Sequence, residues 1–258
     1  RHPLGDRVIT TQLGRRLEQL PEQTIDDLQL PDARFGLYDW ALISDHLLHT
    51  SLLVFHPQLE QIECERLVQL FETSTAQEAP AFSLRKPFQA DLDQEEYRNA
   101  IERIQAYIQA GDCYQVNFAQ RFQAPCQGDA WSAYRALRAA CPTPFAGFQA
   151  LDDGGAILSL SPERFLQVSQ GRVETRPIKG TRPRGATPTE DAANAAELLA
   201  SPKDRAENLM IVDLLRNDLG RSCSTGSVRV PELFALESYP NVHHLVSAVA
   251  GGLAAGKD

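Results

Sequence analysis

Four short strand-like segments follow one another with almost no chain between them, and this restricts the fold more than any other feature. The segments are 145–151, 156–160, 164–169 and 172–178, and two of their connections read DDGG (152–155) and SQG (169–171). Turns this short join antiparallel strands, whereas parallel strands need a crossover of a dozen residues or more. The sequence therefore predicts consecutive antiparallel hairpins in this part of the chain.

Helical patterns lie on both sides of these hairpins. Asp93 and Glu96 have the spacing of a capping box, apolar residues then recur at helical spacing, and Gly111 suits the end of that helix. Further helices are predicted over 14–20, 58–72, 129–141, 189–200 and 202–219, and further strands within 35–55 around a turn at 44–46 and over 113–122, 228–230 and 242–249. The fold class predicted is α+β.

Composition excludes several classes of protein. The 258 residues are 43% apolar with a formal charge of −9, which argues against disorder and against a dedicated nucleic-acid binder. No apolar run reaches the 18 residues of a membrane span, so no membrane partner is expected. The five cysteines show no CxxC spacing and are odd in number, which indicates neither a disulfide framework nor a zinc site and favours a cytoplasmic location.

One linker-like stretch, TSTAQEAP at 73–80, places a domain boundary near residue 80. The chain opens on Arg1 rather than Met, and its last residues, AAGKD, look like the middle of a connection. We therefore expect a piece of a longer protein, with one domain over 1–80 and a second over 91–258.

The segment 172–184 (RVETRPIKGTRPR) concentrates positive charge in an acidic chain. It is open to two interpretations, a solvated basic loop or a pocket for a small anion. Gly180 would let a ligand approach the backbone closely. Lys179 lies between Arg176 and Arg182, and neighbouring cations disfavour the ammonium form, which would make this amine a better nucleophile or base.

Acidic side chains form a second group of candidates. Asp204 and Glu207 are three residues apart on a predicted helix, so they project from one face and suit a hard cation such as Mg²⁺. Acidic residues in a first helical turn also complement the helix dipole, and this alternative stays open. Glu163 follows Pro162 at a strand start and is a weak acid–base candidate. His243 and His244 are adjacent in a strand and should face opposite ways, with one of them inward.

Five strings, taken together, resemble a known family. They are GDCYQVN (111–117), GAILSLSPERFL (155–166), RPIKGTRPRG (176–185), ENLMIVDLLRNDLGR (207–221) and VHHLVSAVAG (242–251). In this order they are similar to motifs of the chorismate-utilising enzymes. The resemblance implies two antiparallel sheets packed as a sandwich with helices outside, a catalytic domain over 91–258 that is truncated at its C-terminus, and the back part of the N-terminal region over 1–80.

The resemblance also assigns roles to the candidates. It implies Mg²⁺ as cofactor, with Glu207 as a ligand and Asp204 as a supporting acid, and chorismate as substrate, contacted at Gly180, Thr181 and His244. Glu163 matches the acid near the C4 hydroxyl group of the ring. Lys179 matches the lysine of the aminodeoxychorismate synthases, in which this amine attacks C2, whereas other members carry Ala at that position.

The expected function is therefore amination of chorismate at C4, with ammonia from a separate glutaminase subunit, on the branch to 4-aminobenzoate and folate. Two alternatives stay open. Another reaction of the family, such as that of anthranilate synthase component I, would keep the substrate and change the product. A non-catalytic module that binds small anions through the basic segment would be a protein of another class.

Overall fold

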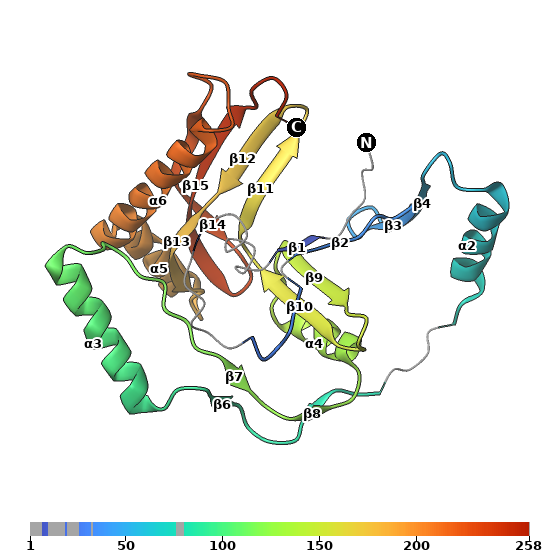
Figure 1. Ribbon diagram of the computed structural model, residues 1–258, viewed down its shortest axis with the longest axis horizontal. Coiled ribbons are helices and arrows are strands. Elements are labelled where there is room, and N and C mark those ends of the chain that lie inside the picture. Colours follow the sequence, from blue (N-terminus) through green and yellow to red (C-terminus); the bar gives the residue numbers. More distant parts are fainter. Residues whose placement is uncertain (1–6, 10–18, 20–25, 32, 76–79, 258) are drawn as a thin grey trace. The chain divides into compact units, whose positions relative to one another are not determined.

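The computed structural model describes residues 7–9, 19, 26–31, 33–75 and 80–257, and Figure 1 traces the chain. The chain divides into two compact units, 1–78 and 79–258. The division falls inside the linker-like stretch 73–80. Each unit is described by itself.

The described residues of the first unit form two antiparallel strand pairs and one helix. β1 (Arg7–Ile9) pairs with β2 (Ala33–Phe35), β3 (Trp40–Asp45) pairs with β4 (Thr50–Phe55), and α2 spans Gln61–Thr73. The hairpin turn lies at 46–49, slightly later than expected, because Asp45 Oδ1 accepts the N–H groups of Leu47 and Leu48 at 2.9 and 2.8 Å. The helix predicted over 14–20 lies outside the described residues, apart from Gln19.

The second unit begins with two-residue strands and a well-capped helix. α3 (Gln94–Ala110) has the predicted capping box between Asp93 and Glu96, and Gly111 ends it with φ of 83°. α4 spans Ala130–Ala140, and the strands β5 (Ser83–Leu84) and β6 (Gln89–Ala90) pair with β8 (Cys126–Gln127) and β7 (Phe122–Gln123).

The strand expected over 113–122 is wrong. Residues 113–121 form no regular structure, and a ladder begins only at Phe122. Alternation of apolar and polar side chains favours an extended backbone, but a strand also needs a partner for its N–H and C=O groups. Within the described residues, 113–120 pair with no strand, and the first such contact is at Arg121, whose carbonyl oxygen accepts the N–H of Asp91 at 2.9 Å.

The hairpins predicted between 145 and 178 are confirmed, and they lead into a five-stranded antiparallel sheet. β9 (Phe145–Ala150) pairs with β10 (Ala156–Ser161). The large sheet contains β11 (Arg164–Ser169), β12 (Arg172–Arg176), β13 (Ile178–Pro183), β14 (Arg229–Ser238) and β15 (Val242–Gly252). β15 is central, because β12 and β13 pair with it one after the other and β14 pairs with it as well.

Two helices cover one face of this sheet (Figure 1). α5 spans Pro188–Ala200 with Thr187 as its N-cap, and α6 spans Pro202–Gly220 with Ser201 as its N-cap and Pro202 in the first turn, as predicted. Val212 and Leu219 of α6 pack on Val173 and Val249 in the main hydrophobic cluster. No helix in the described part of the chain is long and apolar enough to cross a membrane.

The α+β class with antiparallel sheets is confirmed, and so is the strand predicted over 172–178, whereas the interpretation of 172–184 as a solvated basic loop is wrong. The segment forms β12 and β13, with only Pro177 between them. Its arginines suggested a loop because charge is rare in buried strands, yet a strand that exposes alternate side chains to carboxylates can hold them.

Candidate active site

The sheet brings Thr181 and His244 together. They are directly opposed residues of β13 and β15, and Thr181 Oγ1 lies 2.9 Å from His244 Nδ1. Since neighbouring side chains of a strand alternate between its faces, His244 lies on the face away from α5 and α6, and His243 lies on the helix side. Both histidines are buried, not one as expected.

Both ring nitrogens of His243 have partners within the protein. Its Nε2 lies 3.0 Å from Asp191 Oδ1 on α5, and its Nδ1 lies 2.8 Å from Ser238 Oγ. His244 is different, because burial lowers its pKa, although Glu237, Glu163 and a hydrogen bond to the Gly180 backbone oppose that effect. A lowered pKa makes His244 a neutral group at physiological pH, able to donate or accept one hydrogen bond.

Glu163 and Lys179 meet at the backbone of a single residue. Glu163 Oε1 accepts the N–H of Ile178 at 3.0 Å, and Lys179 Nζ donates to the carbonyl oxygen of Ile178 at 3.0 Å. Glu163 lies in the short connection from β10 to β11, where its own N–H donates to Ser161 Oγ at 3.2 Å. A carboxyl group and an amine are thus held on the two sides of one residue of β13.

The prediction that Gly180 lets a ligand approach the backbone is wrong, because the space beside its Cα atom is already filled. Its φ is 91°, and a Cβ atom there would lie 2.9 Å from both Asp204 Cβ and Leu198 Cδ1. The missing side chain admits the two helices rather than a substrate.

The two carboxylates of α6 have different surroundings. Asp204 is buried, and its Oδ2 lies 3.0 Å from Arg182 Nη2. Glu207 is half-buried, and its Oε1 accepts a long hydrogen bond of 3.5 Å from the Gln115 side chain. Within the described residues no Lys or Arg pairs with Glu207.

Mg²⁺ prefers one or two carboxylates and completes its coordination with water and substrate oxygens. Glu207 fits this requirement, because its carboxylate has no cation beside it. Asp204 fits it less well, since a guanidinium group already binds one of its oxygens. In the described part of the chain no three His, Cys, Asp or Glu side chains gather as a metal-binding group.

Three of the four arginines of the basic segment, Arg176, Arg182 and Arg184, are paired with carboxylates. Arg176 contacts Glu232 and Glu237 at 2.7 and 2.6 Å, and Arg182 contacts Glu197 and Asp204. The interpretation as a solvated basic loop is wrong, because these charges are compensated within the unit. The flanking arginines therefore do not act on Lys179 as free cations.

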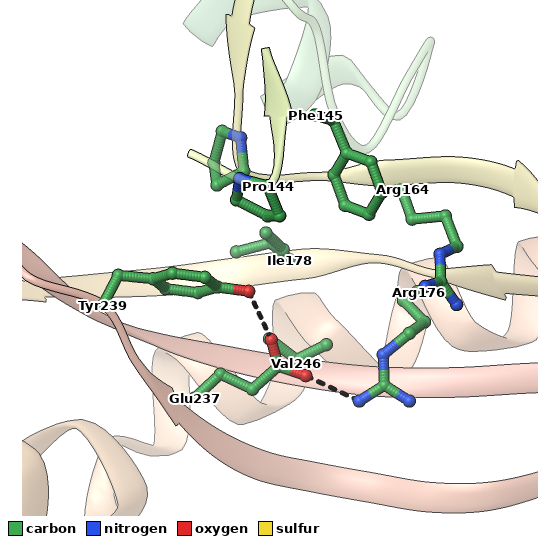
Figure 2. Close-up of a pocket in the computed structure, with 9 residues that line it drawn as sticks. Pro144, Phe145, Arg164, Arg176, Ile178, Glu237, Tyr239 and Val246 are labelled. Atoms are coloured by element: carbon green, nitrogen blue, oxygen red, sulfur yellow. Dashed lines mark hydrogen bonds and ion pairs between the residues drawn. The ribbon is translucent and has the colours of Figure 1, made fainter. Parts of the chain in front are cut away.

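A cavity of about 290 Å³ opens beside these residues, between the start of β9, the β10–β11 connection and the large sheet. Figure 2 shows Glu237 between Tyr239 and Arg176 on its floor. Tyr239 donates to Glu237 Oε2 at 2.7 Å, and Arg176 donates to Oε1 at 2.6 Å. Burial together with Glu237 raises the pKa of Tyr239 to about 12. Burial alone would raise the pKa of Glu237, but its two hydrogen bonds outweigh burial and lower it.

Sequence reasoning missed Glu237 and Tyr239. The signal was present, because residues two apart on a strand share a face, but the strand was expected to end at 230. It also missed Asn208, a fully buried amide of α6 that donates to the Leu245 carbonyl at 3.1 Å and accepts from Ser247 Oγ at 2.6 Å.

The predicted residues therefore fall into two groups. Glu163, Thr181 and His244 lie together on the open side of the sheet, while Asp204 and Glu207 come from α6 on the other side. Lys179 and Gly180 lie between the two groups, because they belong to β13, which has one group on each of its faces.

Known proteins are similar to this chain in sequence and in fold. The family model described as chorismate binding enzyme matches residues 8–258. Aminodeoxychorismate synthase component 1 of Klebsiella aerogenes is 53% identical over 94% of this chain and 52% of its own length, and the Escherichia coli protein of that name is 48% identical over 93% and 52%. Anthranilate synthase component 1 of Thermus thermophilus is 42% identical over 95% and 54%.

Among solved structures, anthranilate synthase component I of Streptococcus pneumoniae matches with a TM-score of 0.85 and 26% identity, over 98% of this chain and 57% of that one. The chain spans about half the length of the curated relatives it matches. With a family model that covers all but the first seven residues, and relatives up to 53% identical among those compared, the chain belongs to the family of chorismate binding enzymes.

Proposed function

We propose that this chain is part of an aminodeoxychorismate synthase, which replaces the C4 hydroxyl group of chorismate by an amino group. The observation that carries the proposal is the pair of hydrogen bonds at Ile178, with Glu163 on its N–H and Lys179 on its C=O. A nucleophilic amine and a proton-donating carboxyl group are the two groups that a displacement through a ring requires. The names of several relatives support the same reaction.

The proposed reaction has two displacements. The Lys179 amine forms a bond to C2, the two ring double bonds shift toward C4, and the hydroxyl group leaves as water with a proton from Glu163. The lysine nitrogen, now carrying an extra proton, returns that proton to Glu163. Ammonia then forms a bond to C4, the double bonds shift back and the C2–N bond breaks, while one proton passes from the new amino group to the departing lysine nitrogen. The sum is chorismate plus ammonia giving aminodeoxychorismate plus water.

The other residues hold the substrate. Thr181 and His244 present a hydroxyl group and a neutral imidazole on the open side of the sheet, where they would bind the polar groups of chorismate. Glu207 would hold Mg²⁺ together with a substrate carboxylate, and the bound ion would draw electron density from the ring. A separate glutaminase subunit would supply the ammonia, as the designation component 1 of the relatives suggests.

A second reaction of the family is supported by other relatives, which are named anthranilate synthase component 1. It would use the same substrate pocket and give a different amino product. Lys179 favours the first reaction, because a direct attack of ammonia on the ring has no use for a second nucleophile at this position.

The test uses the full-length protein with chorismate and Mg²⁺ but without ammonia or glutamine. We expect a covalent adduct to accumulate, because the first displacement can occur while the second nucleophile is absent. Intact-mass measurement followed by peptide mapping should place it on Lys179. Lys179→Ala should abolish the adduct, and Lys179→Arg should as well, because a guanidinium group stays protonated.

An alanine variant that makes the 4-amino product at the normal rate would contradict covalent catalysis. Separation of the products after ammonia is added distinguishes the two reactions of the family, because each gives a different amino compound.

A further inference from the structure

The backbone of β13 is irregular at the position of Lys179. The register with β15 shifts between Ile178 and Thr181, and Gly180 has a φ of 91°, in the left-handed region that side chains rarely adopt. Lys179 therefore lies in a bulge, and bulges redirect the side chains they carry. Something must hold the bulge in one conformation if the amine is to point at a substrate.

Asp204 is the side chain that packs against this bulge. A Cβ atom on Gly180 would lie 2.9 Å from Asp204 Cβ and 3.1 Å from its Cγ, so the carboxyl group fills the space that glycine leaves. Only 13% of the Asp204 side chain is exposed. The N–H of Asp204 donates to Ser201 Oγ at 3.3 Å, which fixes the residue in the first turn of α6.

Arg182 completes the attachment of β13 to the helices. Its Nη2 reaches Asp204 Oδ2 at 3.0 Å, its Nε and Nη2 bind Glu197 at 2.8 and 2.9 Å, and its Nη1 donates to the carbonyl oxygen of Thr181 at 2.9 Å. Hydrogen bonds from Ser201 and Arg182 lower the pKa of Asp204 against the opposing effect of burial, so it is ionised at neutral pH. The strand after the bulge is thus fastened to both helices through one guanidinium group.

We propose that Asp204 is a positioning residue for Lys179, which holds the β13 bulge through Gly180 and Arg182, and that Glu207 alone of the two α6 carboxylates serves the metal. The proposal rests on the function proposed above for Lys179. Its physical basis is that a cation at Asp204 would compete with a guanidinium group already bound there, whereas Glu207 has no such competitor among the described residues.

The experiment compares three variants of the full-length protein that each exchange one carboxylate for an amide on the same helix. Asp204→Asn tests the proposal, and Glu207→Gln is the reference for a metal ligand. Asp213→Asn is the matched control, because Asp213 is 77% exposed and, among the described residues, pairs only with the exposed Arg216. The measurements are the rate of adduct formation on Lys179 without ammonia, the Mg²⁺ concentration for half-maximal rate, and amide hydrogen exchange of peptides over 178–183.

For Asp204→Asn we expect the adduct rate to fall about 10- to 100-fold, as for a misplaced reacting group. The Mg²⁺ concentration for half-maximal rate should stay unchanged, and exchange over 178–183 should become faster. Glu207→Gln should instead raise the Mg²⁺ requirement and leave that exchange unchanged. Asp213→Asn should match the wild type in all three measurements.

The proposal would be overturned if Asp204→Asn raised the Mg²⁺ requirement as much as Glu207→Gln does. It would also be overturned if the wild type formed the adduct and Asp204→Asn formed it at the same rate. If the wild type forms no adduct, the proposed function fails instead, and hydrogen exchange still decides whether Asp204 holds the bulge.

Arg182→Lys gives an independent variant, because lysine keeps the charge and loses the forked contacts. If Asp204 acts through Arg182, the double variant should be no slower than the slower single variant. Multiplied effects of the two changes would contradict the proposed attachment.

Discussion

The neutral state of His244 depends on burial among acidic and polar groups. The groups that face it are Glu163, Glu237 and Thr181, with the ring of Tyr239 at 5.6 Å between centroids. Burial lowers the pKa of His244 despite the two carboxylates, so desolvation has the larger effect. An imidazole in this state can hydrogen-bond a substrate without adding a positive charge.

We predict that this histidine makes the protein less stable in mild acid. Its pKa is lower in the folded state than the unfolded value of about 6.5, so its contribution to stability is complete above pH 6.5 and is lost as pH falls through the folded pKa. Each unit of depression corresponds to about 1.4 kcal/mol. Thermal unfolding midpoints measured between pH 5 and 8 should fall less steeply on the acid side for His244→Asn than for the wild type. Identical slopes would contradict the assignment.

At the scale of elements, the glycine in β13 serves contact between a strand and two helices. Gly171, in the β11–β12 turn of the same sheet, also has a positive φ of 72°, but a Cβ atom there would have no neighbour within 4 Å. Replacing Gly171 would therefore cost only backbone strain, whereas replacing Gly180 would cost backbone strain and would also displace neighbouring side chains.

Gly180→Ala should destabilise the protein more than Gly171→Ala. Both changes place a side chain in the left-handed region, at a cost of about 1–3 kcal/mol. Only Gly180→Ala also pushes on Asp204 and Leu198, for which overpacking typically adds roughly 1–3 kcal/mol. Thermal unfolding of both variants measures the difference. Equal loss of stability would mean that the helices move aside without cost.

Helices and turns whose sequence signals lie within a few residues could be predicted from the sequence. The caps of α3 and α6 and the tight turns lie within a few residues of sequence, so these elements were predicted correctly. A strand was predicted over 172–178, but the sequence did not show that its arginines are neutralised, because the carboxylates that pair with them, including Glu197, Glu232 and Glu237, come from other elements of the chain. For the same reason the sequence paired Asp204 with Glu207, while the structure pairs it with Arg182.

At the scale of the whole molecule, large apolar side chains stay exposed in both units. Examples are Leu47 at 88%, Phe165 at 76% and Tyr114 at 74% exposure. Where exposed apolar side chains form a contiguous patch, that patch is typical of a surface that packs on further protein. This agrees with the coverage of about half of each curated relative.

We predict that the 258 residues alone do not convert chorismate with Mg²⁺ and ammonium ions, and that they associate with one another through this surface. The full-length protein is the control and should be active and less prone to association. Product analysis and sedimentation velocity measure the two properties. Turnover by the 258-residue chain at the rate of the full-length protein would contradict the prediction.

The central place of β15 in the sheet has a consequence for how the protein is made. β12, β13 and β14 all pair with a strand that ends at Gly252, so none of them has this partner while the ribosome is still upstream. From Arg172 to Gly252, synthesis takes roughly 4 to 16 seconds at usual rates, and unpaired strands are prone to aggregate during such a wait. β13, the strand that carries Lys179, is therefore among the parts of this nascent chain that most need protection from aggregation until β15 emerges.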